Sequence, residues 1–114
     1  MFKEGLLKGK RILITGGGTG LGKEIAAGYL QLGAEVWIAG RRGAVLDSCS
    51  KELTEKYGGT VRTHAVDIRD AQAVDAMVQR IWDEAGPLSG LVNNAAGNFI
   101  SPTKDLTQIG RAHV

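Results

Sequence analysis

A cluster of glycines near the N-terminus is the feature that most constrains what this chain can fold into. The cluster follows the largely apolar run Arg11–Ile14 and precedes a stretch with helical hydrophobic spacing, and its members are Gly16, Gly17, Gly18, Gly20 and Gly22. Without a Cβ, glycine adopts positive φ and lets backbone N–H groups approach an anion, and the positive end of the next helix dipole favours the same ligand. The pattern therefore predicts a strand, a pyrophosphate-binding loop and a helix. A turn that only lets the helix pack close to the strand is the alternative.

The spacing of these glycines distinguishes between phosphate-binding loops. The pattern G-x-G-x-x-G fails because Leu21 stands where its third glycine belongs. The pattern of P-loop nucleoside triphosphatases nearly fits from Gly17 to Lys23, but Glu24 replaces the hydroxyl that would hold magnesium, and its carboxylate would repel phosphate. A P-loop enzyme is therefore disfavoured. The pattern that remains is T-G-x-x-x-G-x-G, over residues 15–22.

The composition excludes several other classes of protein. Hydrophobic residues make up 43% and charged residues 23% of the 114 positions, which is ordinary for a globular chain. No apolar run approaches the roughly 20 residues of a membrane-spanning helix, and residues 1–5 lack the apolar region of a signal peptide, so we expect a cytoplasmic protein with no membrane partner. The net charge of +2 is too small and too evenly spread for binding nucleic acid. Cys49 is the only cysteine and has no ligand spacing with His64 or His113, so no metal site is predicted.

Hydrophobic periodicity alternates between short runs typical of strands and longer stripes typical of helices. Strands are expected at residues 10–15, 35–39, 60–66 and 90–93, and helices at 20–32, at 43–57 and between Asp70 and Gly86. Asp70 is expected to cap the third helix, and Gly33 to end the first. The side chains expected to face the core are Leu21, Ile25 and Tyr29 or Leu32 on the first helix, Leu46, Cys49, Leu53 and Tyr57 on the second, and Val74, Met77, Val78, Ile81 and Trp82 on the third.

Three strand–helix units in succession predict an α/β fold with a parallel sheet. The expected architecture is the N-terminal half of a doubly wound Rossmann fold with strand order 3-2-1-4. The carboxyl ends of parallel strands meet at one edge, where the ligands of such folds bind. Four segments would converge there, namely the glycine loop, 40–42, 67–70 and 94–97.

The segment after the second strand distinguishes between nicotinamide cofactors. A site for NAD(H) usually places a carboxylate there, which accepts a hydrogen bond from the ribose 2′-hydroxyl. Gly40 occupies that place, and Arg41 and Arg42 follow it. Guanidinium groups pair with a 2′-phosphate, and cations are unfavourable at a helix N-terminus unless an anion is present. The sequence therefore predicts NADP(H) as the cofactor. A solvated helix start is the alternative role for these arginines.

Two motifs extend this interpretation to a family. The loop T-G-x-x-x-G-x-G resembles the cofactor loop of the short-chain dehydrogenase/reductases, and the segment 93–97, N-N-A-A-G, resembles their N-N-A-G motif with one alanine more. The pair Asp67-Ile68 resembles the residues that flank the adenine ring in that family, where the aspartate accepts a hydrogen bond from the adenine amino group. The cofactor-binding residues that the pattern and the resemblance imply are Thr15, Gly16, Gly17, Gly18, Thr19, Gly20, Leu21, Gly22, Arg41, Arg42, Asp67, Ile68, Asn94, Ala95 and Gly97.

The continuation N-F-I-S-P-T, at 98–103, is similar to the 2,4-dienoyl-CoA reductase branch of the family. That branch uses NADPH to reduce dienoyl-CoA esters in fatty-acid β-oxidation, so the resemblance implies an acyl-CoA substrate and a whole protein that is a homo-oligomer, a tetramer in this family. Arg69, Phe99 and Thr107 match positions that touch the acyl-CoA. Arg69 could pair with a CoA phosphate and Phe99 could pack on an acyl chain, although a surface cation and a packing aromatic are the alternatives for these two.

The proton-donating motif of the family is missing from these 114 residues. The family's chemistry uses a Tyr-x-x-x-Lys helix beside a serine, with the lysine lowering the tyrosine pKa. Tyr29 and Tyr57 are the only tyrosines here, and Gly33 and Val61 stand four residues after them. No catalytic residue is therefore assigned, and the expected role is an inactive cofactor-binding part of a reductase. A nucleotide sensor without chemistry, a methyltransferase with a related loop, and a family member acting on a carbonyl or alcohol remain as alternatives.

The last residues depart from the family pattern. The segment 109–114, I-G-R-A-H-V, back-translates with allowed codons to a common sequencing-adapter read. We therefore expect residues 1–107 to form a partial NADP-binding domain, and residues 108–114 to be a non-native tail.

Overall fold

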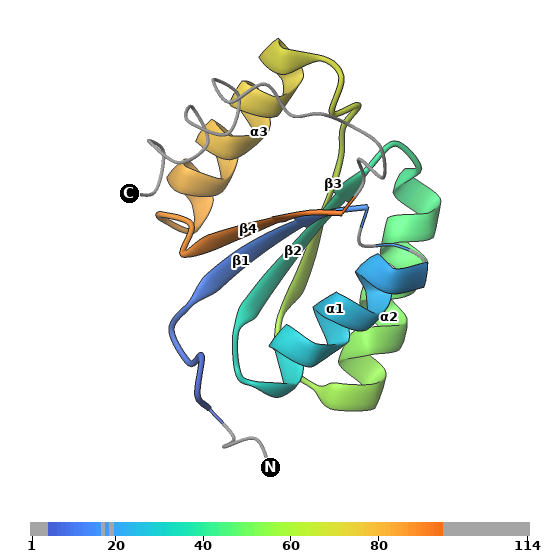
Figure 1. Ribbon diagram of the computed structural model, residues 1–114, viewed down its shortest axis with the longest axis vertical. Coiled ribbons are helices and arrows are strands. Elements are labelled where there is room, and N and C mark those ends of the chain that lie inside the picture. The colour runs from blue at the N-terminus through green and yellow to red at the C-terminus, as the bar shows by residue number, and fades with distance from the viewer. Residues whose placement is uncertain (1–4, 17, 19, 95–114) are drawn as a thin grey trace.

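The computed structural model describes residues 5–16, 18 and 20–94, and strands and helices alternate along them (Figure 1). The elements in chain order are β1 (Arg11–Thr15), α1 (Gly20–Gln31), β2 (Glu35–Gly40), α2 (Gly43–Tyr57), β3 (Val61–Ala65), α3 (Ala71–Glu84) and β4 (Gly90–Asn93). The four predicted strands and three predicted helices are all present in this part of the chain. None of its helices is both long and apolar enough to cross a membrane.

The strands form one parallel sheet with the order β3-β2-β1-β4. Ile12 of β1 lies opposite Val36 of β2 on one side and Gly90 of β4 on the other, and Val36 lies opposite Val61 of β3. Helices α1 and α2 cover one face of the sheet, and α3 covers the other (Figure 1). The predicted order 3-2-1-4 and the doubly wound architecture are confirmed.

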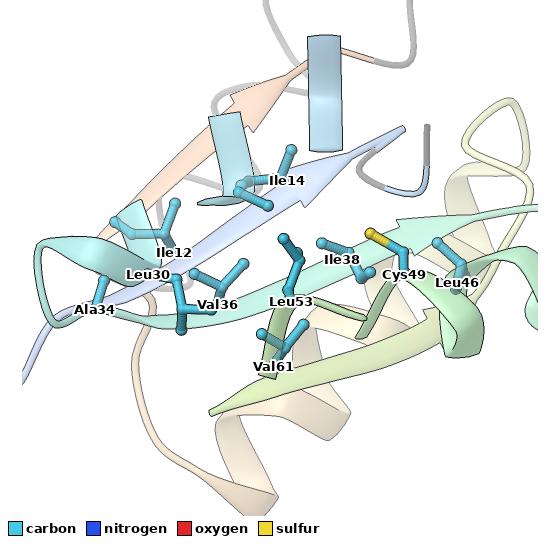
Figure 2. Close-up of a cluster of buried hydrophobic side chains, with 11 residues drawn as sticks. Ile12, Ile14, Leu30, Ala34, Val36, Ile38, Leu46, Cys49, Leu53 and Val61 are labelled. Carbon is cyan, nitrogen blue, oxygen red and sulfur yellow. The ribbon is translucent and has the colours of Figure 1, made fainter. Parts of the chain in front are cut away.

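The core on the α1 and α2 side is built from alternate residues of the inner strands. Ile12 and Ile14 of β1 and Val36 and Ile38 of β2 point to this side, as the two-residue period of a strand requires (Figure 2). The helices and β3 complete the cluster with Ala26, Leu30, Ala34, Leu46, Cys49, Leu53 and Val61. Cys49 is buried in this cluster, as predicted, and burial raises the pKa of its thiol.

The other face of the same strands packs against α3. Leu13 of β1 and Trp37 of β2 are buried on this side, together with Met77 and Ile81 of α3. Both faces of β1 and β2 are thus apolar, which is typical of parallel strands covered by helices on both sides. The Trp37 indole nitrogen donates a hydrogen bond of 2.5 Å to Glu35, so its polar atom is satisfied at the sheet end.

Two predicted boundary residues lie at the ends of their helices, Asp70 before α3 and Gly33 after α1. The Asp70 carboxylate accepts hydrogen bonds from the backbone N–H groups of Gln72 and Ala73, at 3.1 and 3.2 Å, so it caps α3 as expected. Gly33 follows α1 with a φ of 95°, a conformation that disfavours residues with a Cβ. Asp70 thus marks where the loop from β3 ends, and Gly33 marks where the turn toward β2 begins.

Three predicted core residues are wrong. Leu21 is 63% exposed, because α1 turns the small residues Gly22 and Ala26 toward the sheet and approaches it closely. Tyr57 is 37% exposed at the last residue of α2, and Trp82 is 45% exposed on α3. Strand and helix ends also differ by a residue or so from the predicted ones, as at β3, which spans Val61–Ala65.

Candidate functional site

The carboxyl ends of the four strands lie together, as the parallel topology requires. Thr15 at the end of β1 lies opposite Ala39 of β2 and Asn93 of β4, and Gly40 lies opposite Ala65 of β3. The predicted cofactor-binding residues that the structure describes lie at these strand ends, in the loops that leave them, or in the first turn of α1. Of the predicted site residues, Gly17, Thr19, Ala95, Gly97, Phe99 and Thr107 lie outside the described residues, as does the segment 108–114.

The glycine-rich segment that spans the loop after β1 and the first turn of α1 has no space for a side chain at one of its described positions. A Cβ on Gly22 would overlap the carbonyl oxygen of Gly16 and lie 2.7 Å from Asn94 Nδ2. A Cβ on Gly18 would lie 3.1 Å from a Val45 methyl group, which is tight. Gly16 and Gly20 have φ angles of 71° and 56°, which favour glycine. The first turn of α1 contains no acidic residue, so its N-terminus can face an anion without repulsion.

Asn94 connects the end of β4 to this loop. Its side-chain Nδ2 donates a hydrogen bond of 3.2 Å to the Gly16 carbonyl oxygen. Beside it, the Thr15 hydroxyl donates to Asn93 Oδ1 at 3.0 Å, and the Gly16 N–H donates to the Ala39 carbonyl at 2.7 Å. The loop is therefore held from β2 and β4 at once. Sequence reasoning missed Asn93, although it lies in the asparagine pair that the motif contains.

Arg41 and Arg42 lie between β2 and α2, and both are exposed. Arg42 occupies the N-cap position of α2 with φ −103° and ψ 95°, and its side chain makes no capping hydrogen bond. The first turn of α2 has no acidic residue that would neutralise these charges. Two guanidinium groups therefore stand at a helix N-terminus, where a cation is unfavourable unless an anion binds.

Asp67 and Arg69 form an ion pair in the loop between β3 and α3. The Arg69 guanidinium donates to both oxygens of Asp67, at 3.1 Å from Nε to Oδ1 and 2.9 Å from Nη2 to Oδ2. The hydrogen bonds from Arg69, with a smaller contribution from the charge of Arg41, lower the pKa of Asp67 to about 2. Ile68, between the two, is partly buried against the α3-side core. At neutral pH the site therefore presents an ionised carboxylate flanked by cations.

The residues at this edge suit the phosphate groups and adenosine of a dinucleotide. The start of α1 offers the positive end of a helix dipole with no acidic residue in its first turn, and the arginines at α2 supply positive charge. The class that this fold and loop define is a dinucleotide-binding α/β protein. Residues 10–110 match the sequence model of the short chain dehydrogenase family, so the chain belongs to that family, as its motifs predicted.

Several curated relatives carry the name 2,4-dienoyl-CoA reductase. The chain is 43% identical over 108 residues to a Caenorhabditis elegans protein named probable 2,4-dienoyl-CoA reductase 3, (3E)-enoyl-CoA-producing, with 94% of this chain and 35% of the relative covered. It is 38% identical over 101 residues to a Bacillus subtilis protein named probable 2,4-dienoyl-CoA reductase, (2E)-enoyl-CoA-producing, with 89% and 39% covered. The chain thus spans about a third of the length of these relatives.

Solved structures of family members have the same fold. A citronellol catabolism dehydrogenase from Pseudomonas aeruginosa is 34% identical with a TM-score of 0.78, and 98% of this chain and 47% of that one are covered. The L-sorbose reductase of Gluconobacter frateurii, in complex with NADPH and L-sorbose, is 26% identical with a TM-score of 0.81, with 97% and 48% covered. These structures therefore agree with the fold and with the family found for this chain.

Proposed function

We propose that this chain is the NADP(H)-binding part of a reductase that acts on an enoyl-CoA or dienoyl-CoA ester. The observation that carries the cofactor assignment is the pair Arg41 and Arg42, exposed at the N-terminus of α2 directly after Gly40. A guanidinium pairs with the 2′-phosphate of NADP(H), whereas a glycine offers no acceptor to the two ribose hydroxyls of NAD(H).

Different residues of the described part of the chain would bind different parts of the cofactor. The backbone at Gly18 and Gly20 would hold the pyrophosphate, Arg41 and Arg42 the 2′-phosphate, and Asp67 the adenine amino group, whereas the backbone N–H of Gly16 already donates to Ala39. Thr15 and Asn94 would act mainly by shaping the loop, because their side chains bond to protein atoms. The nicotinamide, when bound, supplies a hydride. What this chain would supply is orientation, because it would hold the cofactor at the edge of the sheet.

The substrate assignment rests on the branch of the family. The two relatives described above carry 2,4-dienoyl-CoA reductase names, and the same substrate class was implied by the segment 98–103. Arg69 is 71% exposed in its side chain, which leaves its outer N–H groups accessible to a phosphate of CoA. Phe99 and Thr107 would contact the acyl part. A cytoplasmic, homo-tetrameric whole protein belongs to the same proposal.

The proton donor would be supplied outside the segment 1–107. Neither tyrosine of the 114 residues belongs to a Tyr-x-x-x-Lys motif, since Gly33 follows Tyr29 and Val61 follows Tyr57 at that spacing. Residues 1–107 would then be the cofactor-binding part, inactive alone, and residues 108–114 a non-native tail.

Reading the source locus beyond Thr107 and assaying the encoded protein tests this proposal. We expect a downstream Tyr-x-x-x-Lys segment and NADPH-dependent reduction of a 2,4-dienoyl-CoA ester. A reductase that uses only carbonyl or alcohol substrates would overturn the substrate assignment. A reading frame without that segment, whose product binds NADPH and oxidises none, would make the protein a nucleotide sensor.

A further inference from the structure

The carboxylate of Asp67 is nearly saturated by one residue. A carboxylate offers about four acceptor sites, two on each oxygen. Asp67 Oδ1 accepts from the Arg69 backbone N–H at 3.0 Å and from Arg69 Nε at 3.1 Å, and Oδ2 accepts from Arg69 Nη2 at 2.9 Å. Within the described part of the chain, this leaves one acceptor site, and it lies on Oδ2.

The loop that carries this pair is fixed at both ends. At its start, the Val66 N–H donates to the Gly40 carbonyl at 2.7 Å, beside Arg41. At its end, the Asp70 N–H donates to the Asp67 carbonyl at 2.9 Å, and the Asp70 side chain caps α3. The remaining acceptor site of Asp67 is therefore oriented by the sheet, by α3 and by Arg69 together.

The setting of this pair differs from that of other ion pairs in the described residues. Lys23–Glu52 joins two helices, Arg80–Glu84 joins adjacent turns of one helix, and Arg11–Glu35 joins the first residues of β1 and β2. Asp67–Arg69 alone among these four lies in a loop at the carboxyl edge, where a nucleotide would be held. A fixed, ionised carboxylate with a single acceptor site accepts one N–H donor and repels an acceptor atom.

We propose that Arg69 is a positioning residue of the nucleotide site. It fixes Asp67 so that only Oδ2 receives a donor from the base, and the site therefore selects a 6-amino purine over a 6-oxo purine. The inference rests on the proposed function, because it places a dinucleotide at this edge. It gives Arg69 a role toward the cofactor, in addition to the CoA contact that the family resemblance implies. Because the hydrogen bonds from Arg69 hold the Asp67 pKa near 2, the carboxylate carries no proton to donate at neutral pH.

Fluorescence titration with NADPH and with its hypoxanthine analogue, which has a carbonyl in place of the adenine amino group, tests this role. We expect the unsubstituted chain to bind NADPH about tenfold more tightly or better, as one hydrogen bond to a charged group allows. Arg69→Gln should reduce this ratio to about twofold or less, because the freed carboxylate can rotate away from the carbonyl of the analogue. Asp67→Asn should bring the ratio near one, because its amide can either donate or accept.

Two further variants separate positioning from charge and from general stability. Arg69→Lys keeps the charge but cannot hold both oxygens in a fork, so it should restore affinity for both nucleotides without restoring the ratio. Arg80→Gln removes an ion pair of 2.5 Å that is also exposed, and it should leave the ratio unchanged. Circular dichroism of each variant verifies that it folds, which the exposure of Arg69 favours.

The outcomes distinguish the two proposals. If the unsubstituted chain binds neither nucleotide, the proposed function fails and the role of Arg69 fails with it. If it binds NADPH but Arg69→Gln keeps the full ratio, the proposed function stands and the positioning role is overturned. The positioning role would also be overturned if Arg80→Gln lowered the ratio of the two nucleotide affinities as much as Arg69→Gln does.

Discussion

Asn94 Nδ2 and the carbonyl oxygen of Gly16 are joined by a hydrogen bond of 3.2 Å, which ties the end of β4 to the first glycine of the cofactor loop. Gly22, one turn into α1, lies against both atoms, with no space for a Cβ. The close approach of α1, the loop and β4 therefore depends on a missing side chain at one position. This contact gives Gly22 a packing role, distinct from any contact with a phosphate.

Gly22→Ala should destabilise the fold and prevent NADPH binding. The added methyl group would force apart α1 and the Gly16 carbonyl, and overpacking of this kind costs about 1–3 kcal/mol. Gly28→Ala is the matched control in the same helix, because a Cβ there meets nothing within 4 Å, and it should stabilise by about 0.5–1 kcal/mol. Urea unfolding and NADPH titration measure both effects. A Gly22→Ala protein with unchanged stability and affinity would show that the loop is not packed in this way.

His64 should make stability depend on pH near neutrality. Its Nδ1 lies 3.1 Å from Arg80 Nη1, and burial first, then the charge of Arg80, lowers the His64 pKa below its ordinary value of 6.5, while Glu84 opposes the shift. The unfolded chain therefore binds a proton at His64 more readily than the folded chain does. The contribution of neutral His64 to the free energy of unfolding is complete above pH 6.5, and it is lost as the pH falls through the folded pKa. The free energy of unfolding should therefore fall on acidification below pH 6.5 more steeply than in His64→Asn. Equal slopes from urea titrations of the two proteins would contradict the prediction.

The 114-residue chain alone should show no NADPH oxidation with a 2,4-dienoyl-CoA ester. It contains no Tyr-x-x-x-Lys motif, and loss of a general acid removes about 10²–10⁴-fold in rate before any loss of substrate orientation is counted. A spectrophotometric assay of NADPH consumption measures this, with a dienoyl-CoA reductase as positive control. Robust turnover by the 114 residues would mean that the proton donor lies among them.

The order and type of the elements could be predicted because each is defined locally. Apolar runs mark β1, β2 and β4, β-branched residues mark β3, and glycines or an aspartate cap mark the helix ends, as Asp70 does for α3. The inward face of α1 was predicted only in part, because its buried residues are Gly22, Ala26 and Leu30, and the first two have small side chains that give little hydrophobic signal. Leu21 has such a signal but is exposed, since the helix is oriented by close packing at the loop and not by its largest side chain.

The place of the site in the fold could be predicted from topology, but the contacts within the site could not be. Parallel strands bring the four loops to one edge whatever their conformation, so the glycine loop, Arg41 and Asp67 were expected there. The hydrogen bonds of Asn94 to Gly16 and of Arg69 to Asp67 depend on loop backbone and rotamers, which no periodicity encodes. The assignment of these residues to ligands stays a prediction, and the structure adds the partners that they have within the protein.

Parallel titration of the chain with NADPH and NADH tests the proposed cofactor site most directly. We expect NADPH to bind at least about tenfold more tightly, because each charge-assisted hydrogen bond to its 2′-phosphate is worth ~1.5–3 kcal/mol. Replacing both Arg41 and Arg42 by alanine should abolish this preference and leave NADH affinity nearly unchanged, because both side chains are exposed and Arg42 makes no capping hydrogen bond. Equal affinity for the two cofactors, or tighter binding of NADH, would contradict the assignment of this edge to NADP(H).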